Sequence, residues 1–259
     1  MTVDAEEWKR WTDARTAKVS APHGVLSLTG THWLAQEPVE IPGVPGHWSA
    51  DGPLARVAAA AGDDLAVGGE AVDGAVGLRP DTDPDAQVAR YRDVLLVPIE
   101  REGELAVRVF DPTAEARASF AGITVFPYAP EWSVPAVYTP FETGEQSITV
   151  PNADGHDRPL AVTGRIAFRL AGEPYALTVS SSGSGLSAVI ADATSGQDTY
   201  RFRFVSMPAP NAEGRTVLDL NRAYLPPCAF ADHFVCPFPP PGNRLPVAVR
   251  AGEKQVLRG

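Results

Sequence analysis

Both cysteines of the chain lie in one stretch, CAFADHFVCPFPPPGNRLP, at residues 228–246, which we call the proline-rich loop. Cys228, His233 and Cys236 are residue types that ligate zinc, and His233 and Cys236 have the spacing of a close ligand pair. A fourth ligand would have to be one of the other histidines of the chain, and none of them lies in a paired motif. The sequence therefore predicts no metal site and leaves these three residues as weak candidates only.

The same cysteines could instead be nucleophiles. A nucleophilic thiol needs an electropositive environment that lowers its pKa, and Arg222 and Arg244 are the nearby basic residues. The favoured alternative is a pair of buried, unreactive thiols beneath a rigid loop, because free cysteine is so often part of the core. Pro239–Pro241 favours an extended segment that holds its shape at low entropic cost. Cys228 stays a catalytic candidate, and we expect the loop mainly to close the fold.

A second polar stretch, DATSGQDTY, spans residues 192–200 between two predicted strands. Asp192, Thr194 and Ser195 could bind a polar ligand there, and Ser195 could act as a nucleophile if a base stood nearby. The alternative is that the Asp and Thr side chains hydrogen-bond their own backbone and shape a tight turn ending at Gly196. Turn chemistry accounts for these residue types directly, so the sequence favours it.

A third stretch, TVLDLNRAY, spans residues 216–224. Strand alternation predicts Asp219 and Asn221 on the same face, and Arg222 and Tyr224 follow them. These residues could form the edge of a site, with Asp219 as an acid or base. Equally, they could anchor the proline-rich loop by satisfying its backbone groups. The sequence leaves both alternatives open.

The elements that must position these residues are mostly strands. One helix is expected, capped by Asp4 and running to about Lys18, with Trp8 and Trp11 packed onto the rest of the protein. A hairpin is expected from Val94–Ile99 and Glu104–Phe110. Further strands are expected at Val134–Thr139, Ser147–Val150, Gly164–Leu170, Tyr175–Ser180, Leu186–Ala191, Tyr200–Ser206, Thr216–Asn221 and Pro246–Arg250.

Alternation in the strand Tyr200–Ser206 predicts that Tyr200, Phe202 and Phe204 share one face and that Arg201 and Arg203 share the other. Short strands at this spacing predict a mainly β fold, either an antiparallel sandwich or a partly open barrel. We expect an N-terminal helix at residues 1–22, a first β-rich subdomain at 23–145, and a second at 146–259 that carries the proline-rich loop. The polar segment Gly144–Pro159 is the expected join.

Charge and hydropathy exclude several partners. The net charge of −10, from 22 basic and 32 acidic residues, argues against nucleic acid and against an anionic membrane surface. No window approaches the ~18 apolar residues of a membrane helix, and the start MTVDAEEWKR lacks the features of a signal peptide. We therefore expect a cytoplasmic protein, in which both cysteines would stay reduced.

Four strings, SLTGTHWL, FAGITVFPYAPEW, DATSGQDTY and DLNRAYLPPCAFADHFVCPFPPPGNRLPVAVRAGEK, together resemble the bacterial family known as domain of unknown function 1684. The resemblance extends from about Trp8 to Lys254 and implies no reaction. It marks Asp192, Thr194, Ser195, Gly196, Tyr200, Asp219, Asn221, Tyr224, Cys228, Cys236, Asn243 and Glu253. His233 is outside that pattern, which weakens the metal hypothesis further. Arg203 and Phe204 stand where the family has an arginine–aromatic pair, but the glycines of the family's adjoining turn are missing here.

Three hypotheses for function follow. The first is a protein that binds a small polar ligand in a pocket built from the C-terminal third, where polar residues gather at strand ends and loops. Its expected ligand-binding residues are Thr194, Tyr200, Arg203, Asn221, Tyr224 and Asn243. The second is a hydrolase or lyase at the same site, with Asp192, Ser195, Asp219 and Cys228 as catalytic candidates. The third is an interaction module that exposes Pro239–Pro241 to a partner. Neither a cofactor nor an oligomeric state is indicated, and whether the protein is an enzyme stays open.

Overall fold

The computed structural model describes residues 5–259, which divide into two compact units. The smaller unit comprises residues 18–119, and the larger unit comprises residues 5–17 together with 120–259. The chain thus passes between the units near residues 17 and 119. The expected join at Gly144–Pro159 lies within the larger unit instead, in a hairpin formed by β13 (Gln146–Pro151) and β14 (Asp157–Val162).

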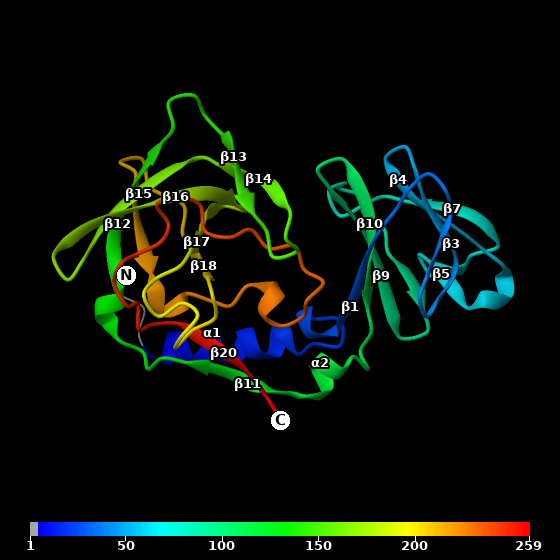
Figure 1. Ribbon diagram of the computed structural model, residues 1–259, viewed down its shortest axis with the longest axis horizontal. Coiled ribbons are helices and arrows are strands. Elements are labelled where there is room, and N and C mark those ends of the chain that lie inside the picture. The colour runs from blue at the N-terminus through cyan, green and yellow to red at the C-terminus, as the bar shows by residue number, and fades with distance from the viewer. Residues whose placement is uncertain (1–4) are drawn as a thin grey trace. The chain divides into compact units, whose positions relative to one another are not determined.

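The smaller unit consists of two antiparallel sheets packed around Trp48, Leu65 and Leu96 (Figure 1). One sheet has the order β1 (Leu28–Trp33), β10 (Glu104–Phe110), β9 (Val94–Arg101), β8 (Ala89–Tyr91), β5 (Leu65–Val67), β6 (Glu70–Ala71). The other has the order β2 (Val39–Ile41), β3 (Val44–Asp51), β4 (Leu54–Ala59), β7 (Gly74–Leu78). A short helix, α2 (Glu115–Ala118), follows these strands.

The hairpin predicted from Val94 to Phe110 is confirmed as β9 and β10, paired from Glu104↔Arg101 to Phe110↔Leu95. Its turn holds Glu102 and Gly103 at φ 59° and 83°. Two consecutive residues with positive φ give the turn whose twist matches that of the flanking strands. The glycine at the second position makes that turn accessible.

The larger unit is built on one curved antiparallel sheet (Figure 1). Its order is β18 (Arg203–Met207), β17 (Gly185–Ile190), β16 (Glu173–Ser182), β15 (Gly164–Leu170), β12 (Ser133–Pro140), β19 (Arg215–Asp219). The larger unit also contains two separate strand pairs: the hairpin β13–β14, and β11 (Phe120–Val125) with β20 (Glu253–Arg258). The mainly β, antiparallel prediction is therefore confirmed.

The expected N-terminal helix is also confirmed, as α1 (Ala5–Val19). The proposed cap Asp4 lies outside the described residues. Trp8 donates its indole N–H to the carbonyl of Asn221 at 2.9 Å, and Arg15 bonds to Glu253 at the start of β20 at 3.1 Å. The first contact holds α1 against Asn221 and the second holds it against β20, near which α1 appears in blue in Figure 1. No helix among residues 5–259 is long and apolar enough to cross a membrane.

Alternation along the central strands separates the two faces of the large sheet. Leu177 and Val179 of β16 and Ile190 of β17 lie in the hydrophobic core. Between them, Thr178 of β16 and Val189 of β17 are only partly buried, because successive side chains point to opposite faces. The second face of the sheet therefore carries both polar and apolar side chains, and the main hydrophobic core does not cover it.

Two predicted strands, Tyr200–Ser206 and Thr216–Asn221, differ from the structure at their ends, and a third is absent. Residues 200–202 precede β18, which begins only at Arg203. The strand β19 stops at Asp219, whose side chain accepts from the Asn221 amide and caps a 3₁₀ turn, η4 (Leu220–Arg222). The strand predicted at Pro246–Arg250 is wrong: this segment is irregular, because side chains rather than a neighbouring strand satisfy its backbone.

Candidate functional site

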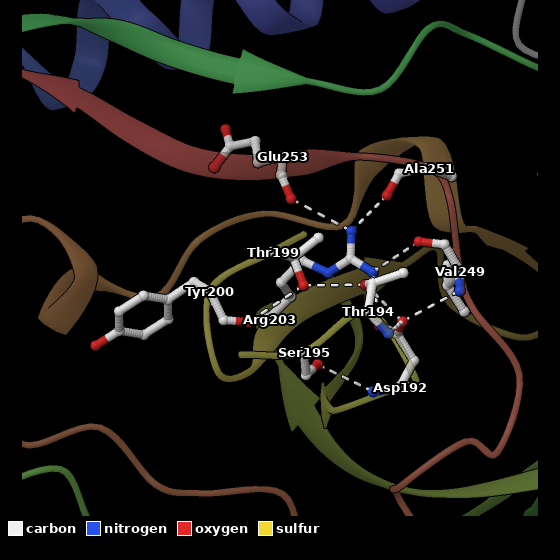
Figure 2. A network of polar contacts seen from close by, with 9 residues as sticks. All are labelled: Asp192, Thr194, Ser195, Thr199, Tyr200, Arg203, Val249, Ala251 and Glu253. Carbon is white, nitrogen blue, oxygen red and sulfur yellow. Dashed lines mark hydrogen bonds and ion pairs between the residues drawn. The ribbon is translucent and has the colours of Figure 1, made fainter. Parts of the chain in front are cut away.

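Asp192 and Arg203 form an ion pair from which solvent is excluded. Arg203 Nη2 donates to Asp192 Oδ2 at 2.7 Å, and neither side chain is accessible. The guanidinium also donates to the carbonyls of Val249, Ala251 and Glu253, which surround it in Figure 2. Burial lowers the pKa of Arg203, and the carboxylate of Asp192 opposes that shift. Since arginine keeps its proton in proteins, the pair is ionic. Arg201 and Arg203, which alternation predicted on one face, differ in burial: Arg201 is exposed and Arg203 is buried.

The other carboxylate oxygen of Asp192 organises the turn that follows it. Oδ1 accepts from the Thr194 amide at 2.8 Å, from the Thr194 hydroxyl at 2.6 Å and from the Val249 amide at 3.1 Å. The Thr194 hydroxyl lies 3.0 Å from that of Thr199. Gly196 has φ 78°, a conformation that favours glycine. The arrangement is thus the side-chain-supported turn that the sequence favoured.

Ser195 takes part in this turn and is not set up as a nucleophile. Its Oγ accepts a hydrogen bond of 3.1 Å from the backbone amide of Asp192. An activated serine instead donates to a base, which is in turn oriented by a third group. The nearest carboxylate, Asp192, has both oxygens engaged elsewhere. The geometry therefore gives no support to an Asp192–Ser195 catalytic pair.

Asp219 and Asn221 form a second, separate network. Asp219 Oδ1 accepts from the amide and from the side chain of Asn221, each at 3.1 Å. Asn221 also exchanges two hydrogen bonds with the backbone of Ala129, at 3.1 and 3.0 Å. Burial raises the pKa of Asp219, and the two hydrogen bonds from Asn221, together with the positive charge of Arg222, oppose the shift. Because Asn221 is buried and bonded to the backbone on two sides, it ties η4 to the segment before β12.

The side chain of Asn243, in the proline-rich loop, hydrogen-bonds to β16 and β17 at a point where these two strands no longer pair. Its side chain accepts from the Thr178 amide at 2.8 Å and donates to the carbonyls of Thr178 and Val189 at 2.8 and 2.9 Å. Strands β16 and β17 pair from Ser180↔Ser187 to Ser182↔Gly185, and the same register would oppose Val179 to Ala188 and then Thr178 to Val189. The fully buried amide bridges the two strands where they separate.

A cavity of about 310 Å³ adjoins this bridge in the larger unit. Strand β16 contributes Thr178, Ser180 and Ser182, and β17 contributes Ser187 and Val189. Ala188 also comes from β17. The rest of the wall comes from β14, β18, the segment after η4 and the proline-rich loop, and comprises Leu160, Val162, Phe204, Tyr224, Pro237, Pro240 and Asn243. No residue of this wall carries a formal charge.

A separate cluster surrounds Cys228, which lies in η5 (Pro227–Ala229). The Tyr200 hydroxyl donates to the carbonyl of Cys228 at 3.1 Å and lies 3.7 Å from its sulfur. Arg201 Nε donates to the Tyr200 hydroxyl at 3.3 Å. The amide of Cys228 donates to the sulfur of Cys236 at 3.4 Å. In Figure 2 the Tyr200 ring extends away from the Asp192–Arg203 pair, so the two polar groups are distinct.

Electrostatics distinguish the members of this cluster. A hydrogen bond from the Cys236 thiol, with smaller contributions from Tyr200 and Arg201, lowers the pKa of Cys228 to about 7, although burial opposes the shift. Burial, followed by the neighbouring Cys228, raises the pKa of Tyr200 to about 12. The nearby basic group is Arg201, rather than Arg222 or Arg244, the pair that proximity in sequence suggested.

The family model described as protein of unknown function (DUF1684) matches residues 118–254, more than half of the chain. The chain belongs to this family. The solution NMR structure of an uncharacterized protein of Haloarcula marismortui is 30% identical to it, covering 52% of this chain and 77% of the other with a TM-score of 0.44. No curated protein matches the chain.

The DUF1684 match contains every candidate residue that the sequence suggested, and the structure divides them among four places. Asp192, Thr194, Ser195 and Arg203 lie in the first network, and Asp219 and Asn221 in the second. Tyr224 and Asn243 line the cavity. Tyr200, Cys228 and Cys236 form the thiol cluster. The expectation that the candidates form one pocket therefore differs from the structure.

The metal candidates do not assemble into a site. Within residues 5–259, no three side chains of His, Cys, Asp or Glu are grouped so that they could hold a metal ion. His233 is exposed, whereas Cys228 and Cys236 are buried free thiols. The expectation of exposed prolines also differs from the structure, since Pro239 and Pro240 are buried and Pro241 is exposed.

Sequence reasoning did not single out several residues of this DUF1684 protein that shape the sites. They are Arg15, Thr178, Ser187 and Arg201, while the run Ser180–Gly185 was interpreted as a flexible hairpin tip. One signal was available: Thr178, Ser180 and Ser182 recur at every second position, so one face of that strand had to be hydroxyl-bearing. Arg15 and Arg201 meet partners far apart in sequence or on another element, and no local pattern marks such contacts.

Proposed function

We propose that this protein binds a small, uncharged molecule with one apolar and one hydrogen-bonding side in the cavity beside Asn243. The observation that carries the proposal is the composition of the wall: hydroxyl and apolar side chains without any charged one. A charged ligand in such a wall would lose hydration without gaining a partner, at a large cost in free energy. An uncharged ligand avoids that cost.

The distribution of the wall residues supports an amphipathic ligand. Strands β16 and β17 contribute hydroxyls, whereas Leu160, Val162 and Phe204 from other elements contribute hydrocarbon. Small-molecule sites combine a mostly apolar wall with a few polar groups that fix orientation, and the volume of about 310 Å³ is near the lower end of their range. Ser182 at the wall is exposed, which supports entry from that side.

The candidate residues contribute to this site unequally. Tyr224 presents its ring to the cavity and packs edge-on against Phe204, with ring centroids 5.8 Å apart. The Asn243 amide already bonds to two strands, so it frames the cavity and leaves recognition to the hydroxyls. No group here pairs a nucleophile with a base, so binding without hydrolysis or elimination is the function proposed. The expected cytoplasmic location is part of the same proposal.

The test compares probes of one shape and three charges: benzyl alcohol, benzoate and benzylamine. We expect saturation-transfer NMR with the full chain to detect benzyl alcohol, and the two charged probes to bind at least about tenfold more weakly. Ser187→Phe should fill the cavity and abolish the signal. Ser181→Phe is the matched control, because Ser181 neighbours Ser182 in β16 but is exposed and does not line the cavity.

Three outcomes would overturn the proposal. They are equal binding of all three probes, no binding of benzyl alcohol, and retention of the signal in a folded Ser187→Phe protein. Amide chemical shifts of Thr178 and Val189 supply a second measurement, because they report on the cavity wall even if Ser187→Phe fails to fold.

A further inference from the structure

Two sulfur atoms adjoin in the proline-rich loop, independently of the cavity. Cys236 Sγ accepts from the backbone amide of Cys228 at 3.4 Å, and the Cys236 side chain is the largest cause of the lowered pKa of Cys228. Backbone bonds fix the second cysteine: its carbonyl accepts from Ala153 at 2.9 Å, and Phe238 donates to Pro151 at 2.8 Å. The thiols are therefore held together by the surrounding backbone.

The groups around Cys228 favour its thiolate over its thiol. The Tyr200 hydroxyl, 3.7 Å from the sulfur, can donate to it, and the Arg201 guanidinium supplies positive charge through its bond to that hydroxyl. Arg201 is itself held over the rings of Tyr200, Phe202 and Phe238, at 5.5, 5.7 and 4.8 Å from their centroids. A thiolate beside a thiol and an arginine is the setting of a reactive cysteine.

The cluster is close to solvent on the arginine side. Cys228 is 7% exposed and Cys236 is 3% exposed. Arg201 is exposed, and Tyr200 is partly buried. Cys228, whose sulfur lies 3.7 Å from the Tyr200 hydroxyl that Arg201 bonds, is the more exposed of the two. The two cysteines therefore have unequal access, which assigns them different roles.

We propose that Cys228 and Cys236 form a reversible intramolecular disulfide, with Cys228 as the thiol that reacts first and Cys236 as the thiol that resolves it. Hydrogen peroxide is the oxidant considered. Attack of the Cys228 thiolate on peroxide forms an S–O bond and breaks the O–O bond. Sulfur loses two electrons to the peroxide, and the released hydroxide takes up a proton to form water.

The second step completes the balance. The Cys236 sulfur attacks the sulfenic sulfur of Cys228, the S–S bond forms, and the S–O bond breaks. The departing hydroxide takes the proton of the Cys236 thiol and leaves as water. In total, two thiols and one peroxide give one disulfide and two waters, and a dithiol reductant reverses the change.

The experiment treats the reduced full chain with one equivalent of hydrogen peroxide at pH 7 and then counts thiols and maps peptides by mass spectrometry. We expect both thiols to be lost together, with a loss of two hydrogens in the linked peptides, and recovery with dithiothreitol. In Cys236→Ser, dimedone should trap a sulfenic acid at Cys228. In Cys228→Ser, oxidation of Cys236 should be at least about tenfold slower.

A measurement on the unchanged protein covers the possibility that a variant does not fold. Iodoacetamide at pH 7 should label Cys228 at least about tenfold faster than Cys236. Equal labelling, retention of both thiols after peroxide, or a disulfide between two chains instead of within one would each overturn the proposal. None of these readouts depends on ligand binding in the cavity.

Discussion

Arg201 and Arg203 lie two residues apart and belong to two different kinds of polar region. Arg203 is enclosed with Asp192, and its two terminal nitrogens donate to that carboxylate and to backbone carbonyls, while Nε is buried without a hydrogen-bond partner among residues 5–259. Arg201 is exposed, stacks on aromatic rings and bonds to the hydroxyl of Tyr200. The first region is sealed against solvent, whereas the second includes a thiol and adjoins it.

The difference shows which property separates architecture from chemistry. In the Asp192–Arg203 network, both carboxylate oxygens are hydrogen-bonded within the protein and the side chain is inaccessible, so a ligand cannot reach it. In the Cys228 cluster, by contrast, the surrounding groups lower the pKa of the Cys228 thiol to about 7. A shifted pKa close to an accessible surface is a better indicator of reactivity than a group of polar residue types.

The largest expected effect comes from disrupting the Asp192–Arg203 ion pair. Arg203→Met would leave the Asp192 carboxylate buried without its partner, and loss of one member of a buried pair typically costs about 3–5 kcal/mol. We expect that decrease in the free energy of unfolding. Urea denaturation followed by fluorescence measures it.

Arg201→Met is the matched control two residues away. It removes an exposed guanidinium over aromatic rings, a contribution of about 0.5–1 kcal/mol. Equal losses for the two variants would show that the sealed and the open region do not differ as described.

A smaller effect concerns pH and the thiol cluster. The pKa of Cys228 falls from 9.0 to about 7 on folding, so the folded state favours the thiolate. The resulting stabilisation is fully present above pH 9 and is lost as the pH falls through 7; two pKa units correspond to at most about 2–3 kcal/mol. The groups facing the thiol are Cys236, Tyr200 and Arg201, and the pKa of Tyr200, about 12, keeps that phenol neutral in this range.

The measurement is the free energy of unfolding of the wild type minus that of Cys228→Ser, in reductant, from pH 6 to pH 9. The difference should increase in favour of the wild type as the pH rises. A difference that stays constant would contradict the thiolate environment described for Cys228.

The smallest expected effect concerns Ser195, in the turn that follows Asp192. Ser195→Ala removes one hydrogen bond to the Asp192 amide, which is worth about 1 kcal/mol. We expect that loss in thermal or urea denaturation and unchanged binding of benzyl alcohol. Loss of probe binding in a folded Ser195→Ala protein would instead connect the turn with the cavity.

Local patterns predicted much of the fold. The alternation of Gly164–Leu170 and the turn between Val94 and Phe110 use interactions within a strand or hairpin, and both are present as β15 and as β9–β10. The turn chemistry of Asp192 and Thr194 was favoured from sequence for the same reason. By contrast, the segment at residues 246–250 has apolar residues typical of a strand but is bonded by Asp192 and Arg203.

The candidate site required more than local pattern. Asn243 lies 65 residues from Thr178, with which its side chain pairs, and Trp8 lies 213 residues from Asn221. Such contacts depend on how strands and loops are brought together, so the residue types at either end do not predict them. Cys228 had Arg222 near it in sequence and Arg201 near it in space.

The sequence by itself determined the antiparallel β character, the N-terminal helix and the turn at Asp192, because side-chain alternation, helix periodicity and hydrogen bonds between near neighbours act over a few residues. Only the tertiary structure decided which polar residues are sealed, which line a cavity and which cysteine is activated. Burial and electrostatic environment come from groups distant in sequence, and these set whether a side chain stabilises the fold or is available for chemistry.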